Sequence, residues 1–178
     1  MPEQQLDGTL ALLARTPFAL DAWLRELPDM WTHRDEGPDT WSAVGVVGHL
    51  VHAERTNWIP RLKTLLQYGE SRPFEPFDRL GHEREIQERS LGALLDEFAR
   101  LRAASLAEVR ELNLRDADFA RTGSHPAFGP VTLAQLLAAW AVHDLTHMHQ
   151  ISRVLAHQYR ELVGPWSEYL GVLKSRQS

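Results

Sequence analysis

The stretch Trp140-Ala141-Val142-His143-Asp144-Leu145-Thr146-His147-Met148-His149-Gln150-Ile151 carries the clearest structural pattern of this sequence. Within and around it, Leu136, Trp140, His143, His147, Gln150 and Val154 recur three and four positions apart. This spacing is typical of one face of an α-helix. It predicts a helix from about Leu133 to Tyr159, for which Thr132 is a suitable N-cap.

The same periodicity predicts three further long helices toward the N-terminus. Their approximate ranges are Gln4–Leu27, which Pro17 should kink or split, Ser42–Tyr68, which Ser42 caps and Gly69 ends, and Glu83–Leu112, which Ser90 can renew. The intervening ranges Pro28–Asp39, Ser71–Gly81 and Asn113–Pro130 are expected as loops, and a short helix Trp166–Leu173 should follow Gly164-Pro165. Sustained strand alternation is absent, and no Asn-Gly or Asp-Gly turn joins two strand-like runs. The prediction is an all-α four-helix bundle in which the connections between helices two and three and between helices three and four are long.

Length and composition limit the class of protein. A chain of 178 residues fits one domain spanning residues 1–178. The net charge of −5 argues against nucleic-acid binding, which depends on basic contacts to phosphates. The sequence contains no cysteine, so any thiol must come from another molecule. Met1–Leu13 has no signal-peptide pattern and no stretch approaches a membrane span, so we expect a cytoplasmic protein without a membrane partner.

The histidine pair on the last long helix indicates a metal site. His143 and His147 are four residues apart, so both imidazoles can reach one ion at about 2.0–2.1 Å. Helical zinc proteases use the same spacing, but here no glutamate follows the first histidine as a general base. The Ser42–Tyr68 helix offers His49 or His52 as a third ligand, and spacing alone does not choose between them. The alternative is that these are ordinary surface or core histidines.

An ordered set of motifs resembles the DinB superfamily over nearly the whole chain. The set comprises Trp41-Ser42 with Gly48-His49-Leu50 and Glu54, then Phe98 and Arg102, Gly123–Pro126 and Gly129–Leu133, Trp140 with His143-Asp144-Leu145 and His147–Ile151, and finally Gly164-Pro165-Trp166 with Tyr169-Leu170. That superfamily includes YfiT-like metalloproteins and thiol-dependent transferases.

The resemblance implies a four-helix bundle that holds a divalent metal, zinc or nickel, on His49, His143 and His147. It also implies a tendency toward homodimers. The function expected on this basis is a metal-dependent enzyme, of the thiol-dependent S-transferase type, that joins a low-molecular-weight thiol to a small electrophilic substrate. The alternatives are a metal-dependent hydrolase and a metal-binding protein without turnover.

Other side chains receive expectations from their positions. Glu54 and Asp144 could orient ligand histidines, although exposure or capping is the expected state of Asp144. Gln150 and the loop residue His125 could contact substrate, in a pocket formed by the ends of helices two and four and the His125 loop. Surface positions are expected for His33, His82 and His157, a different helix face for His149, and core or rim packing for Trp23, Trp31, Trp41 and Trp58.

Overall fold

The computed structural model describes residues 3–87 and 89–174. Its α-helices are α1 Glu3–Leu24, α2 Asp29–Thr32, α3 Ala43–Thr56, α4 Trp58–Tyr68, α5 Gly81–Ile86, α6 Leu91–Glu111 and α7 Leu133–His157. Its strands are β1 Thr122–His125 and β2 Gly129–Thr132, and its 3-10 segments are η1 Gly69–Ser71, η2 Asp116–Ala120, η3 Gly164–Glu168 and η4 Gly171–Leu173. The fold is therefore mostly helical, as predicted.

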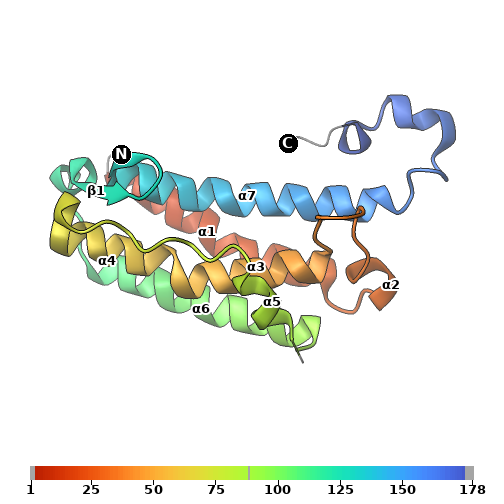
Figure 1. Ribbon diagram of the computed structural model, residues 1–178, viewed down its shortest axis with the longest axis horizontal. Coiled ribbons are helices and arrows are strands. Elements are labelled where there is room, and N and C mark those ends of the chain that lie inside the picture. The colour runs from red at the N-terminus through yellow and green to blue at the C-terminus, as the bar shows by residue number, and fades with distance from the viewer. Residues whose placement is uncertain (1–2, 88, 175–178) are drawn as a thin grey trace.

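The long helices lie side by side along the molecule (Figure 1). Helix α1 packs against α6 and α7, and α3 packs against the same two helices. In Figure 1, α1 and α7 run in one direction, whereas α3, α4 and α6 run in the other. The chain after α4 returns along the outside of the bundle to α5, so helices two and three of the prediction are parallel neighbours. The predicted long connection thus serves as a crossover.

Pro17 does not split the first helix, because its effect on the hydrogen-bond ladder is compensated. A proline has no N–H for the carbonyl four residues earlier, which here belongs to Leu13. The guanidinium of Arg102, on α6, donates to that carbonyl oxygen at 2.8 Å. Both Leu13 and Arg102 are almost fully buried. A side chain from another helix therefore replaces the hydrogen bond that Pro17 removes.

The second predicted helix is interrupted at Asn57. The structure has α3 and α4 in place of one continuous helix, and Asn57 lies between them with φ −108° and ψ −63°. Pro60, in the first turn of α4, cannot donate to the Thr56 carbonyl and its ring crowds that carbonyl. Ser42 caps α3 as expected by accepting a hydrogen bond from the Gly45 N–H at 3.2 Å.

The third and fourth helices begin at the predicted caps. Ser90 renews the third helix by accepting from the Ala93 N–H at 3.2 Å, which separates α6 from the short α5. Thr132 starts α7 with a reciprocal capping box, in which the Gln135 side-chain oxygen accepts a hydrogen bond from the Thr132 N–H at 2.8 Å.

Three further segments differ from the prediction. The range Pro28–Asp39, expected as a loop, contains the one-turn helix α2. The range Asn113–Pro130 contains an antiparallel hairpin, β1–β2, closed by residues 126–128 and by Gly129 at φ 72°. A three-residue hairpin loop with glycine in the left-handed region has none of the dipeptide signals that mark a two-residue hairpin turn. The predicted helix Trp166–Leu173 is instead the pair of short 3-10 segments η3 and η4, and Trp166 and Tyr169 are exposed.

The apolar core has two parts, and α7 contributes to both. One cluster contains Leu133, Leu137 and Trp140 of α7, and the other contains Ile151. His143 and His147 therefore lie between the two clusters, in the middle of the bundle. No helix among the described residues is long and apolar enough to cross a membrane.

Candidate metal centre

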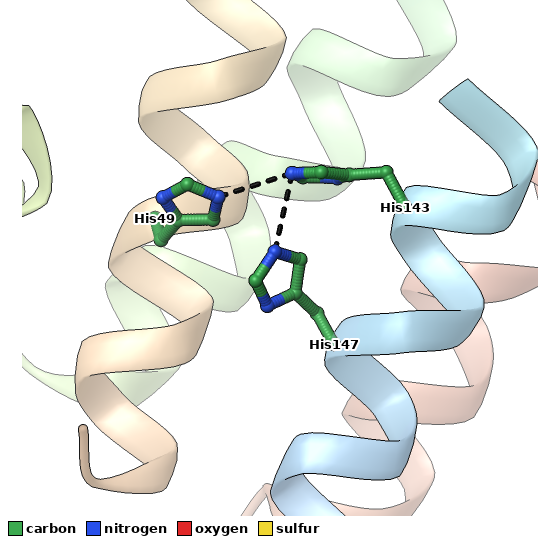
Figure 2. A group of neighbouring side chains, drawn as sticks. All are labelled: His49, His143 and His147. Atoms are coloured by element: carbon green, nitrogen blue, oxygen red, sulfur yellow. Dashed lines mark hydrogen bonds between the residues drawn. The ribbon is translucent and has the colours of Figure 1, made fainter. Parts of the chain in front are cut away.

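Three histidines from two helices meet inside the bundle. His49 projects from the middle of α3, and His143 and His147 project from α7 (Figure 2). His143 Nε2 lies 3.0 Å from His49 Nε2 and 3.1 Å from His147 Nε2. Two nitrogens bound tetrahedrally to one zinc ion lie about 3.3 Å apart. The three rings are therefore spaced almost as ligands of a single ion.

Hydrogen bonds alone satisfy this cluster poorly. The Gln150 side-chain oxygen lies 2.8 Å from His147 Nδ1, so that nitrogen donates and leaves Nε2 of the neutral ring as a lone pair. If His143 Nε2 carries a proton, that proton can point toward His49 or toward His147, but not toward both. If His49 Nε2 carries the proton instead, the Nε2 lone pairs of His143 and His147 face each other. A cation that accepts all three lone pairs removes this conflict. The residues present thus fit a divalent metal.

Burial keeps the three imidazoles in the form that binds a metal. Desolvation, reinforced by neighbouring histidines, lowers the pKa of His49 to about 3 and that of His143 to about 2. Burial also lowers the pKa of His147. Neutral imidazole is the ligand form, so the site needs no deprotonation at neutral pH. The Nδ1 atoms of His49 and His143 have no hydrogen-bond partner among the described residues.

The remaining histidines lie outside this group. His52 is buried, but its ring packs on Phe77, with centroids 5.2 Å apart, and against Gly81. His149 and His33 are exposed and His157 is partly exposed, as expected. The expectation for His82 was wrong, because it is 4% exposed. Its ring lies 4.3 Å from the Trp41 ring at a tilt of 45°, and its Nδ1 donates to the Arg79 carbonyl.

Asp144 and Glu54 do not contact the histidines, and the expected exposure of Asp144 is wrong. Asp144 is 1% exposed and receives hydrogen bonds from Arg102 at 2.6 and 3.0 Å. Glu54 receives one from the same guanidinium at 3.0 Å. Burial raises the pKa of Glu54, and the Arg102 charge opposes that rise. The two carboxylates therefore stabilise a buried arginine beneath the site.

The histidine cluster opens onto a cleft of about 820 Å³. Aromatic side chains line much of it: Trp41, Trp58, Phe77 and Phe128. The Trp41 ring lies 4.8 Å from the His49 ring, and the Trp58 ring lies 5.1 Å from the His143 ring. Trp41 and Trp58 thus pack around the site, beyond the simple core or rim role that was expected. Trp23 and Trp31 line a separate apolar pocket at the far end of α7.

The cleft has cationic groups and no acidic ones among its described lining residues. Arg61 and Arg79 line it, as does His125 from the hairpin. His125 stacks on Phe128 with ring centroids 4.4 Å apart. Burial is the main cause that lowers the pKa of His125, and the positive charge of Arg61 lowers it further. The expected pocket beside the His125 loop is present, but the 76–79 segment also forms its wall, and the histidines come from the middle of the helices.

Sequence reasoning did not identify Asn57 and Arg61 as cleft residues. His49, Ala53, Asn57 and Arg61 all line the cleft and follow one another at intervals of four. Residues four apart share a helix face, so extension of the His49 face along the predicted helix was the available signal. The segment containing Phe77 has no helical period and offered no such signal.

The fold and the three-histidine cluster define a helical-bundle protein with a candidate metal centre. The family model of the DinB superfamily matches residues 12–151, so the chain belongs to the DinB superfamily. This finding confirms the resemblance drawn from the motifs.

Two solved structures share the fold. One is described as "YfiT from Bacillus subtilis is a probable metal-dependent hydrolase with an unusual four-helix bundle topology", and it is 20% identical over 92% of this chain and 90% of that chain, with a TM-score of 0.73. The other, TT2238, described as a four-helix bundle protein, is 21% identical over 83% of this chain and 98% of that chain, with a TM-score of 0.55. None of the curated proteins compared matches the sequence.

Proposed function

We propose that this protein is a metal-dependent enzyme whose divalent ion is held by His49, His143 and His147. The observation that carries the proposal is that the cluster forms part of the wall of an open cleft. A structural metal site is usually closed by four protein ligands, whereas a catalytic site keeps a position for water or substrate. Within the described residues, the group of possible ligands contains three side chains.

The residues around the cluster would have different roles in such an enzyme. A divalent ion bound there would lower the pKa of a coordinated thiol or water and so supply a nucleophile near neutral pH. Gln150 fixes the orientation of His147 through Nδ1. Trp41 and Trp58 pack against the histidine rings and exclude water from their sides. The remaining aromatic side chains offer an apolar surface to the substrate.

Transfer of an external thiol is the reaction that this cleft supports best. Helical zinc hydrolases commonly place a carboxylate beside the ion as a general base for the attacking water, and none of the described residues lining the cleft is acidic. Both nearby carboxylates, Glu54 and Asp144, are held by Arg102. A thiol is acidic enough to ionise without such a base, and because the chain has no cysteine, the thiol would come from a low-molecular-weight compound.

Metal-dependent hydrolysis is the second candidate, because the fold is like that of YfiT, a probable metal-dependent hydrolase. Zinc or nickel as the ion, a cytoplasmic location and a homodimeric assembly belong to the same proposal. A metal-binding role without turnover is the third candidate.

Replacement of the proposed ligands tests the site itself. Each of His49→Ala, His143→Ala and His147→Ala should greatly reduce the metal bound by protein purified without an affinity tag. The matched replacements His52→Ala and His149→Ala should retain it, because neither ring reaches the cluster. Elemental analysis per mole of protein measures the result. Equal metal content in all five variants would contradict the assignment.

A spectroscopic titration separates the three candidates. In the cobalt-substituted protein, a small thiol should produce a sulfur-to-metal charge-transfer band, and the His143→Ala variant should lack both the band and any transferase rate. If the thiol leaves the spectrum unchanged while water exchanges at the metal, hydrolysis is the better hypothesis. A site that exchanges neither would favour a role without turnover.

A further inference from the structure

Arg61 is a partly buried cation without an acidic partner. It lies in the cleft wall, three residues after Trp58 on α4. Its guanidinium donates one long hydrogen bond, 3.4 Å, to the Glu75 carbonyl and lies 5.5 Å from the centre of the Phe74 ring. No carboxylate of the described chain forms an ion pair with it, and burial lowers its pKa without an opposing acidic group.

Among the described residues, the other sheltered arginines are all paired. Arg102 contacts Asp144 and Glu54, and Arg153 contacts Glu36 at 2.6 Å. A partly desolvated guanidinium that lacks a counterion is unfavourable, because the lost hydration is not replaced by an ion pair. Arg61 therefore differs from Arg102 and Arg153 in having no ion-pair partner, and it lies in the wall of the cleft. The missing counterion fits a ligand of the cleft better than a residue of the chain.

Two unpartnered polar atoms lie in the same wall. Asn57, one turn before Arg61, is 7% exposed, and its Oδ1 has no hydrogen-bond partner among the described residues. The indole Nε1 of Trp58, which is 6% exposed, is also buried without a partner. Both residues line the cleft. Buried polar groups in native structures are normally satisfied, so two residues with unmet hydrogen-bonding capacity beside an unpaired arginine add to the polar character of this wall.

We propose that Arg61 binds an anionic oxygen group of the small-molecule substrate, a carboxylate or a phosphate, while the apolar part of that molecule packs on Trp58 and Phe128. The planar guanidinium matches both anions through paired hydrogen bonds. The neutral histidines, Arg61 and Arg79 leave the cleft lining without negative charge, so an anion meets no acidic group there. This proposal rests on the proposed function, since it names the substrate class of the same site.

Binding of simple probes to the purified full-length protein tests the proposal. Phenylacetate and phenyl phosphate share an aromatic ring and differ in the anion, and phenylacetamide is the neutral match. Calorimetric titrations would be made with metal-loaded and with metal-free protein, for wild type, Arg61→Gln and Arg79→Gln. Arg79 is exposed and lines the same cleft, so its replacement removes an equal charge without removing the partly buried guanidinium.

The expected result is that at least one anion binds wild type at least about tenfold more tightly than the amide. Arg61→Gln should remove most of that difference with and without metal and leave amide binding unchanged, whereas Arg79→Gln should have a much smaller effect. The probe that loses more affinity in Arg61→Gln shows whether Arg61 binds a carboxylate or a phosphate. Arg61→Lys should retain part of the preference, which excludes misfolding as the cause.

Three results would overturn the role of Arg61: equal effects of the two glutamine variants, an equal loss of amide binding, or no preference for either anion in wild type. These are distinguishable from failure of the proposed function. That failure would appear as absent metal or absent chemistry, whereas the metal-free titrations report on Arg61 alone.

Discussion

Replacement of Arg102 by methionine should destabilise the bundle strongly. Arg102 donates to the Leu13 carbonyl at 2.8 Å, to Asp144 at 2.6 and 3.0 Å and to Glu54 at 3.0 Å. Methionine retains much of the length of the side chain but none of these hydrogen bonds. The variant would leave two carboxylates and the carbonyl freed by Pro17 buried without their donor.

The magnitude follows from these lost contacts. Removal of one partner from a buried ion pair costs about 3–5 kcal/mol, and a buried carbonyl without a donor costs about 1–3 kcal/mol. The two effects share one side chain and overlap, so we expect a loss of about 4 kcal/mol in the free energy of unfolding. For a chain of this size, that loss lowers the midpoint of thermal unfolding by about 10–15 °C.

Urea unfolding followed by circular dichroism at neutral pH measures this loss. Arg100→Met is the matched control, because Arg100 lies on the same helix with a side chain that is 65% exposed, and its replacement should leave stability nearly unchanged. The loss for Arg102→Met should decrease at lower pH, where the abandoned carboxylates can become protonated. A loss below about 1 kcal/mol, or one equal to that of the control, would refute the reasoning.

Three further predictions concern pH, close packing and helix propensity. Burial lowers the pKa of His49 to about 3 and that of His143 to about 2, from 6.5 in the unfolded chain. Between the folded and unfolded pKa values, the unfolded chain binds more protons than the folded protein does, so the metal-free protein should lose stability as the pH falls below about 6.5. The loss should be at most about 1.4 kcal/mol per pH unit for each histidine. Urea midpoints across this range should show it, with a shallower slope for His143→Phe; a flat profile would contradict the burial argument. Gly81→Ala should cost about 1–3 kcal/mol, because the new Cβ would overlap the His52 ring. Gly8→Ala, in α1 with open space around it, should stabilise by about 0.5–1 kcal/mol in the same urea unfolding assay.

Local features of the chain were sufficient to predict most of the helical architecture. The caps Ser42, Ser90 and Thr132 act on backbone groups three residues away, so their effect is visible in the sequence itself. His143 and His147 share a face of α7 for the same local reason, since their spacing is close to one helical turn. The motifs added the family, which the family model confirms.

Only the packing of distant segments decided the rest. His49 and His52 are three residues apart and lie near the same helix face, and the contact of α5 with α3 directs His52 toward Gly81 while His49 meets α7. The burial of Asp144 depends on Arg102, 42 positions away, and the cleft depends on the 76–79 segment and the hairpin. Periodicity reports which face of a helix is apolar, but it carries no information about which segment will cover that face. The sequence alone therefore determined the helices and the histidine pair, whereas the tertiary structure decided the third histidine's neighbours and the open side of the site.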